Sequence, residues 1–328
     1  MRLWNIYHPE IPDFLSEAAD APAMVRLQNV GMNCGCEYTQ FPIFANLAPY
    51  SRFDHSMGVA LIVWHFTEDS AQAMSGLLHD IATPTFAHVV DFLHGDHMTQ
   101  ESTESATPAM IRADANLCAT LERCALPVTA VEDYHIYPIA DNDSPKLSAD
   151  RLEYTLGNGV NFGIITREQA AAYYEDLTVG TNEHGEPELV FRHPDIARAF
   201  AETALQCSKI YISDANRYAM QILAELLRDA IAAEVLTEDD LWLDEPAVIG
   251  KLRSSHLSRD WEAFCGLSRI MRADTPGNEG RWRCIHAKRR CIDPYIYGTG
   301  RVSACFPEFS RELDAFRNCS LDYWLNAK

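Results

Sequence analysis

Positive charge is scarce in this sequence. The 328 residues include 27 Lys and Arg against 47 Asp and Glu, which gives a formal net charge of −20. A field of that sign repels polyanions, so the composition argues against a protein that binds nucleic acid without sequence preference. A small anionic substrate is compatible with it, but such a substrate must meet a local cluster of basic side chains.

Long apolar runs are also missing. The longest, Val59 to Trp64, is far too short to cross a bilayer, and Met1 to Phe14 lacks the apolar segment of an export signal. The 10 cysteines include no pair with the spacing of a zinc knuckle or a redox motif, and Cys34-Gly35-Cys36 alone is a weak indication of metal binding. We therefore expect a cytoplasmic protein with reduced thiols and no membrane segment.

Helical patterns are abundant. Apolar residues make up 47% of the chain, enough for a large core. The patterns predict helices over 54–66, from Thr67 or Asp69 to Ile81, after Pro84, from Ser144-Pro145 to Gly157, over 167–177 and as one long helix over 196–233. They also predict a hairpin turning at 183–185 and short strands within 281–306. The expected fold is mainly α, a helical core over 1–235 with a packed helical/β extension over 236–328 that holds a small C-terminal β element.

Histidine is concentrated in the first third of the chain. Six histidines lie within 43 residues: His55, His65, His79, His88, His94 and His97. The most informative arrangement is His55, the adjacent His79-Asp80, and Asp150, each in a separate predicted helix. A His-Asp pair alone is usually a surface or capping pair. Here, however, it ends an apolar helix, and metal coordination would offset the burial of its charge. Two imidazoles and two carboxylates suit Mn²⁺, Fe²⁺, Ni²⁺, Co²⁺, Zn²⁺ or Mg²⁺.

These motifs resemble a known family. The three segments are Arg52-Phe53-Asp54-His55-Ser56, Leu78-His79-Asp80-Ile81 and Ser148-Ala149-Asp150-Arg151. Together they are similar to the H…HD…D pattern of the HD-domain superfamily, and the nearest branch is that of the deoxynucleoside triphosphate triphosphohydrolases. The resemblance covers Leu47 to Ile164. It implies an HD-domain helical bundle whose divalent metal is held by His55, His79, Asp80 and Asp150.

The resemblance also implies acid–base residues. The segment from His79 to Asp91 is similar to the family run HD-x-G-H-x-P-F-x-H-x-x-D, which makes His88 a catalytic imidazole and Asp91, at i+3, the residue that orients it. Alternatively, His88 is an ordinary histidine on a helix surface. Two positions depart from the family pattern. Thr83 replaces a histidine, and Gln100 stands where a later histidine is expected, with His97 as a possible substitute.

Candidate substrate contacts come from two further parts of the chain. Arg52 precedes His55 by three residues and should enter the same pocket. Arg151 and Tyr154 resemble the family's D-K/R-x-x-Y, in which both contact substrate phosphate, although Arg151 near Glu153 could instead be a solvated charge. Lys209 and Tyr211 lie in a segment that weakly resembles a family helix whose basic and tyrosine residues contact the nucleotide.

The tail contains the local basic cluster that the net charge requires. Arg281, Arg283, Lys288, Arg289 and Arg290 fall within ten residues. Lys288 and Arg290 belong to a run similar to K-x-R-x-x-D-P of the same branch, which implies substrate contacts. The cluster could equally pair with acidic surface such as 238–240, or form an oligomer contact.

The leading interpretation is a phosphohydrolase in which metal-activated water attacks a phosphoester or phosphoanhydride of a nucleotide. Release of triphosphate from a nucleoside triphosphate and release of orthophosphate from a smaller phosphomonoester are both open. The alternative is a non-catalytic nucleotide-sensing protein. In it the metal has a structural role that holds the helices together, and the pocket binds a nucleotide without turnover. Expected partners are a small phosphorylated substrate and, in either case, a possible second copy of the chain, with no membrane and no nonspecific nucleic acid.

Overall fold

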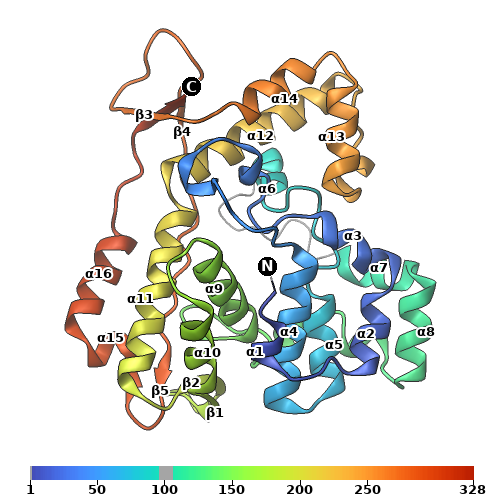
Figure 1. Cartoon of the computed structure of the whole chain (residues 1–328), viewed down its shortest axis with the longest axis vertical. Coiled ribbons are helices and arrows are strands. Elements are labelled where there is room, and N and C mark those ends of the chain that lie inside the picture. The colour runs from blue at the N-terminus through green and yellow to red at the C-terminus, as the bar shows by residue number, and fades with distance from the viewer. Residues whose placement is uncertain (1, 96–105) are drawn as a thin grey trace.

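Helices make up most of the structure, a computed structural model that describes residues 2–95 and 106–328 (Figure 1). The mainly α prediction is confirmed. In chain order the α-helices are α1 (Trp4–Tyr7), α2 (Asp13–Ala19), α3 (Pro22–Arg26), α4 (Arg52–Thr67), α5 (Ser70–Leu78), α6 (Val89–His94), α7 (Thr107–Ala113), α8 (Ala115–Arg123), α9 (Ala149–Asn161), α10 (Arg167–Glu175), α11 (Pro194–Tyr211), α12 (Asp214–Ala232), α13 (Glu245–Arg253), α14 (Ser258–Cys265), α15 (Val302–Cys305) and α16 (Pro307–Arg317). The strands are β1 (Leu177–Thr181), β2 (Pro187–Phe191), β3 (Ile270–Ala273), β4 (Arg283–Cys284), β5 (Tyr295–Ile296), β6 (Gly300–Arg301) and β7 (Trp324–Ala327).

The β structure is more extensive than a small C-terminal element, which corrects that part of the prediction. The expected hairpin is present as antiparallel β1 and β2. Strand β5 pairs parallel to β2, so the hairpin and the tail form one four-stranded sheet in the order β1-β2-β5-β6. A second sheet has the order β3-β7-β4. Sequence patterns show strands but not their partners, and the pairing of distant short strands enlarges both sheets.

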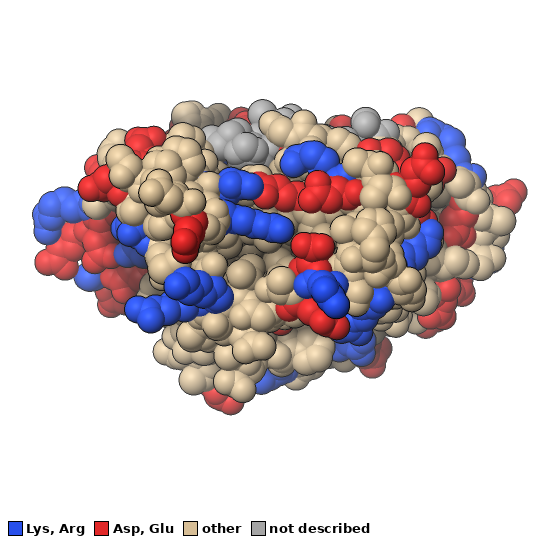
Figure 2. Space-filling model, turned by 90° about the horizontal axis from the view of Figure 1, so that it is seen from above, with Lys and Arg blue, Asp and Glu red and all other residues tan. Residues whose placement is uncertain are grey.

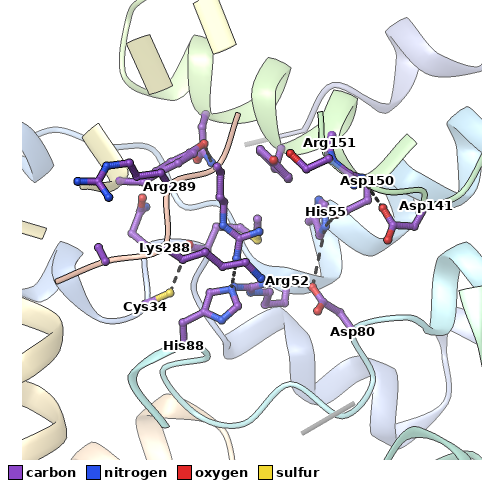
Figure 3. A pocket seen from close by; sticks show the side chains of 18 of the residues that line it. Cys34, Arg52, His55, Asp80, His88, Asp141, Asp150, Arg151, Lys288 and Arg289 are labelled. Atoms are coloured by element: carbon purple, nitrogen blue, oxygen red, sulfur yellow. Dashed lines mark hydrogen bonds and ion pairs between the residues drawn. The ribbon is translucent and has the colours of Figure 1, made fainter. Parts of the chain in front are cut away.

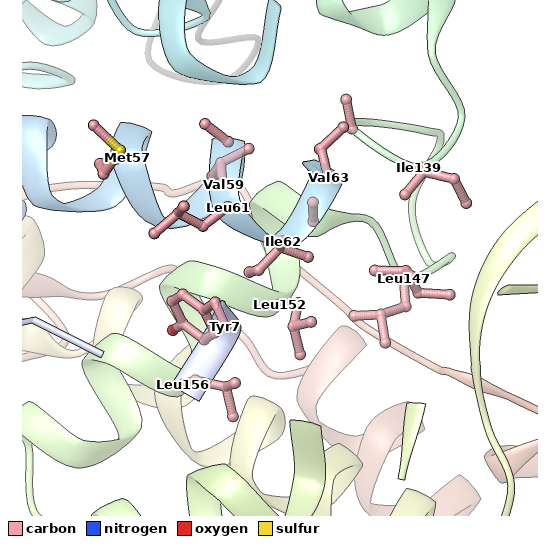
Figure 4. Close-up of a cluster of buried hydrophobic side chains, with 14 of the residues drawn as sticks. Tyr7, Met57, Val59, Leu61, Ile62, Val63, Ile139, Leu147, Leu152 and Leu156 are labelled. Atoms are coloured by element: carbon pink, nitrogen blue, oxygen red, sulfur yellow. The ribbon is translucent and has the colours of Figure 1, made fainter. Parts of the chain in front are cut away.

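Helix α4 runs through the core. Every residue from Arg52 to Val63 is buried, so the helix lacks the polar face of a surface helix. Its apolar side chains lie beside those of α9 and of the segment before α9 (Figure 4). Side chains that start on such a helix are held rigidly, which matters because Arg52 and His55 lie in its first turn.

Side-chain caps define where the helices of the candidate site begin. Ser51 and Asp54 form a reciprocal capping box at the start of α4, and Asp69 accepts hydrogen bonds from two backbone N–H groups at the start of α5. Ser148 accepts from the backbone N–H of Arg151 at 3.3 Å and caps α9. The predicted start at Ser144-Pro145 is therefore wrong, because the capping hydroxyl is that of Ser148. Gly157 does not stop this helix, which continues to Asn161.

Two further helix predictions need correction. The single helix expected over 196–233 is divided into α11 and α12, because Ser213 caps a new start by accepting from the backbone N–H of Asn216 at 3.3 Å. The helix expected after Pro84 begins only at Val89. Phe86 and Ala87 have positive φ values of 60° and 47°, which no helix tolerates and which cost about 1–3 kcal/mol each.

The core consists of two clusters of buried apolar side chains. One gathers residues of α4, α5, α9, α11 and α16, and the other those of α6, α12, α13 and α14, which lie together at the top of Figure 1. Phe309 belongs to the first and Trp261 to the second, so residues beyond 235 contribute to both. The boundary at residue 235 stays a prediction. Over the described residues, no helix has both the length and the apolar character of a bilayer span.

Candidate metal centre

The four predicted metal ligands converge. His55 lies in the first turn of α4, His79 and Asp80 directly follow α5, and Asp150 is the second residue of α9. Ligand atoms of His55, His79 and Asp80 all lie within 4.8 Å of one another. Figure 3 shows the side chain of Asp150 beside that of His55. Three rigid elements thus bring together side chains that are far apart in the sequence.

The spacing of the ligand atoms fits one small cation. His55 Nε2 lies 3.2 Å from His79 Nε2, 3.0 Å from Asp150 Oδ1 and 4.0 Å from Asp80 Oδ2. His79 Nε2 lies 3.6 Å from Asp80 Oδ2 and 3.8 Å from Asp150 Oδ1. Ligands about 2.1 Å from a common ion are about 3.0 Å apart when adjacent and about 4.2 Å when opposite, so these five separations fall in that range. His55, His79 and Asp80 therefore fit a divalent metal, and Asp150 adjoins them through its contacts with the two histidines.

Both histidines are oriented by a second hydrogen bond. His55 Nδ1 lies 2.6 Å from Glu153 Oε2, and His79 Nδ1 lies 2.7 Å from the carbonyl oxygen of Gly76. Each ring thereby directs Nε2 to the centre, as expected for metal-bound histidines that donate their other N–H to an acceptor.

Glu153 is a residue that sequence analysis missed, naming it only as a neighbour of Arg151. Its side chain is only 2% exposed, and it accepts hydrogen bonds from the hydroxyls of Tyr7 (3.4 Å) and Tyr50. Its position three residues after Asp150, on a helix already assigned to the site, is the signal that could have identified it.

The approach of Glu153 to α4 requires a glycine. A Cβ atom on Gly58 would lie 2.6 Å from both Cγ and Oε1 of Glu153. We expect Gly58→Ala to destabilise the fold by about 1–3 kcal/mol through overpacking and to weaken metal binding by displacing the Glu153 carboxylate from His55. Gly250→Ala is the matched control, because no atom lies within 4 Å of its added Cβ and alanine favours a helix by about 1 kcal/mol. Thermal unfolding of both variants is the measurement, and equal melting temperatures would contradict the packing argument.

The cluster carries concentrated negative charge. Burial raises the pKa of Asp80, but Arg52 and the two histidines outweigh burial and hold the pKa well below its usual range. Burial likewise raises the pKa of Asp150, and contacts with His55 and His79 bring it down. For His55, burial lowers the pKa, while hydrogen bonds with Asp150 and Glu153 raise it to about 10. Without metal, a proton on His55 therefore neutralises part of the carboxylate charge, and cation binding would release that proton.

Arg52 and Thr83 both hydrogen-bond to Asp80. Arg52 Nη1 donates to Asp80 Oδ2 at 3.0 Å, and its Nε has no hydrogen-bond partner among the described residues. Thr83 Oγ1 donates to Asp80 Oδ1 at 2.8 Å. The threonine that departs from the family pattern thus orients a candidate ligand, whereas His97 and Gln100 lie outside the described residues.

His88 and Asp91 form the expected pair. His88 Nδ1 lies 2.9 Å from Asp91 Oδ2, and Nε2 lies 3.2 Å from Arg290 Nη2. Burial lowers the pKa of His88, the positive charges of Arg290 and Arg52 lower it further, and Asp91 opposes them. A neutral ring that donates from Nδ1 and accepts at Nε2 satisfies both contacts.

The remaining predicted contacts divide into two groups. Tyr154, Tyr211, Lys288 and Arg290 line the same cavity of about 470 Å³ as the candidate metal ligands. Burial raises the pKa of Tyr154 to about 12. Lys209 does not line it. Its ammonium lies 3.7 Å from Glu312, on a side chain that is 52% exposed.

Arg151 lines the cavity, but its guanidinium is paired with the carboxylate of Asp141. Its Nη1 lies 2.5 Å from Asp141 Oδ1 and donates to Ser148 Oγ at 2.9 Å, and its Nη2 donates to the carbonyl oxygen of Asn142. Asp141 was not identified from the sequence. Figure 3 shows the pair on the far side of His55 and Asp150 from Arg52 and His88.

The basic cluster of the tail is also divided. Arg281 lies 3.5 Å from Asp260, and Arg283 lies 2.6 Å from Glu225, so both belong to ion pairs away from the cavity. Residues 287–291, between β4 and β5, line the cavity. This segment is fixed by Ser144 Oγ, which donates to the carbonyl oxygen of Cys291 at 2.8 Å. In the acidic stretch 238–240, Asp240 pairs with Lys251 at 2.6 Å.

Comparisons with known proteins find two relatives of low sequence identity. The chain is 24% identical to the uncharacterized protein YdhJ of Bacillus subtilis over 257 residues, 75% of this chain and 74% of that protein. It is 27% identical to the metal-dependent phosphohydrolase cns2 of Cordyceps militaris over 139 residues, 41% of this chain and 39% of that protein. No protein-family model matches the chain.

Two crystal structures share the fold over nearly the whole chain. A phosphohydrolase of Bacteroides thetaiotaomicron has a TM-score of 0.66 at 14% identity, with 97% of this chain and 96% of that chain covered. A hypothetical protein of Aquifex aeolicus has a TM-score of 0.64 at 16% identity, with 97% and 93% covered. The chain is thus similar in part of its sequence to one metal-dependent phosphohydrolase and in fold to a protein named a phosphohydrolase, and the triphosphohydrolase branch stays a prediction.

Proposed function

We propose that this chain is a metal-dependent phosphohydrolase that acts on a nucleotide or a related phosphate ester or anhydride. The observation that carries the proposal is the meeting, in one cavity, of the four candidate metal ligands, His88 and basic side chains, with Asp91 hydrogen-bonded to His88 from outside the cavity lining. A divalent cation at the ligand set supplies Lewis acidity for water activation and for the charge of phosphoryl oxygens.

The protein's own groups have separable roles in this proposal. Arg52 stabilises negative charge on the phosphoryl group, because its guanidinium lies beside the ligand Asp80. Asp91 fixes the Nδ1–H of His88, so Nε2 is the atom that exchanges a proton with the reacting groups. Arg290 Nη2 lies 3.2 Å from His88 Nε2, and when substrate binds it can donate to a phosphate oxygen instead.

The size and lining of the cavity support a nucleotide. A volume of about 470 Å³ is in the range of small-ligand pockets, and Tyr154, Phe162 and Tyr211 give it aromatic surface. The face of the molecule in Figure 2 shows acidic and basic side chains interspersed rather than one continuous basic surface. That distribution supports a small ligand over a long polyanion. Cytoplasmic location and a second copy of the chain stay predictions.

The proposal is tested by loading the purified protein with Mn²⁺, Fe²⁺, Ni²⁺ or Co²⁺ and measuring release of phosphate products. We expect His88→Ala to lower kcat by about 10²–10⁴-fold while metal content is retained, the range for loss of a general acid or base. His94→Ala is the matched control, because that side chain is 45% exposed and does not line the cavity.

Full activity in His88→Ala would contradict the acid–base role of His88 but not hydrolysis itself. The proposed function is contradicted by a metal-loaded wild type that turns over no phosphate ester or anhydride although a nucleotide raises its melting temperature, a result that favours the non-catalytic sensor instead.

A further inference from the structure

The cavity contains more basic residues than it presents to the metal centre. Among the described residues, six Lys and Arg side chains line it: Arg52, Arg151, Arg217, Lys288, Arg289 and Arg290. Arg217 is buried against Asp214 (2.8 Å) and the carbonyl oxygen of Ile285, and Arg289 donates to the carbonyl oxygen of Cys319. The guanidinium groups of Arg217 and Arg289 thus donate to other parts of the chain.

Arg151 is engaged in the same way. Its donors reach Asp141, Ser148 and the carbonyl oxygen of Asn142. Both members of the Asp141–Arg151 pair have side chains 12% exposed, where a bidentate-capable guanidinium is strongly held by its carboxylate. The positive charge of Arg151 is therefore balanced by Asp141 in the absence of substrate.

The two sides of the metal centre differ in charge as a result. Arg52 and Arg290 lie beside Asp80 and His88, on one side. On the other side is the neutral Asp141–Arg151 pair. Asp143 belongs to the same cavity wall, but its carboxylate is 95% exposed and lies 4.0 Å from Lys146. A single phosphoryl group needs donors on one side of the metal only. Each further phosphate of a polyphosphate adds charge that needs further donors.

We infer that the cavity accepts one phosphoryl group, as in a phosphate monoester. Asp141 sets this preference, because the donors of Arg151 that it binds are then not available to the further phosphates of a polyphosphate. The inference rests on the proposed function and decides between its two open products. It assigns orthophosphate rather than triphosphate as the group released. Asp141 acts through Arg151 and is thus a positioning residue that determines specificity.

The test compares mono-, di- and triphosphates of the same nucleosides on the metal-loaded wild type, with kcat/KM for each and identification of the phosphate released. We expect the monophosphate to be preferred by at least about tenfold, the effect of one charge-assisted hydrogen bond. Asp141→Ala should raise the triphosphate-to-monophosphate ratio by about tenfold, because Arg151 gains freedom to donate to a second phosphate. Asp141→Asn, which keeps an acceptor for Arg151, should change the ratio less.

Asp143→Ala is the matched control. It removes the same charge from the same wall, but its side chain is 95% exposed and does not contact Arg151. Wild-type preference for the triphosphate, an unchanged ratio in Asp141→Ala, or an equal change in Asp143→Ala would each overturn the inference.

Failure of the inference is distinguishable from failure of the proposed hydrolase. Calorimetric binding of the same nucleotides to the metal-loaded protein measures the mono-to-triphosphate preference without turnover. Absence of all hydrolysis contradicts the proposed function, whereas tighter binding of the triphosphate to the wild type contradicts the assignment of a single phosphoryl group. Melting temperature and metal content verify that each variant is folded and loaded.

Discussion

Asp150→Ala is expected to abolish both metal binding and hydrolysis. Asp150 Oδ1 lies 3.0 Å from His55 Nε2, so its removal takes one of the four proposed ligands and leaves the buried His55 without the partner on that side. Loss of a residue that merely orients a ligand already costs about 10–100-fold in metal affinity, and we expect a larger loss here. Metal analysis after dialysis and the phosphate-release assay measure the two effects together.

The control for this variant is again Asp143→Ala. It removes an aspartate from the same cavity wall without removing a ligand atom, so metal content and kcat should stay within about threefold of the wild type, as for other changes to exposed charges. If Asp150→Ala retained metal with the affinity of the wild type, Asp150 would not be a ligand, whatever its effect on activity.

Glu153→Gln is expected to have the second largest effect. The carboxylate accepts hydrogen bonds from His55, Tyr7 and Tyr50 in a site almost closed to solvent. Glutamine keeps the volume but removes the charge and offers one acceptor oxygen instead of two. Metal affinity should fall by about 10–100-fold, because the tautomer of His55 is no longer fixed. The free energy of unfolding should fall by about 1–3 kcal/mol, the cost of a buried donor without its acceptor.

Glu175→Gln provides the comparison for Glu153→Gln, since Glu175 is an exposed residue at the end of the neighbouring helix α10. It should change neither metal affinity nor unfolding. Metal titration at fixed pH and chemical denaturation of the metal-free protein separate the two consequences. Unchanged metal affinity in Glu153→Gln, with a loss of stability alone, would show that this carboxylate is a packing element and not part of the metal centre.

The sequence was most informative where short motifs lie on strongly patterned helices. His55 and Asp150 lie in the first turns of two predicted helices, and His79 and Asp80 follow a third. Their approach to one another follows from the packing of these helices. The hydrogen bond between His88 and Asp91 was also predicted, because i and i+3 neighbours meet even where the chain makes a turn before α6 instead of a helix.

Features that depend on tertiary contacts were not predictable. Nothing in the segment around residue 141 indicates that Asp141 takes the donors of Arg151, or that the tail brings Arg290 to His88 across 202 positions of sequence. Glu153 was missed because a glutamate near an arginine on a helix is usually solvated. The pairing of β5 with β2 has the same cause, since two-residue strands carry too little pattern to identify their partners.

The most direct test of the account is crystallography of the metal-loaded protein with anomalous diffraction at the absorption edge of the metal. We expect an anomalous peak about 2.0–2.3 Å from Nε2 of His55, Nε2 of His79 and carboxylate oxygens of Asp80 and Asp150. Absence of a peak there from a crystal grown at saturating metal, with His55 still hydrogen-bonded directly to Asp150, would contradict the metal centre and the hydrolysis proposed from it.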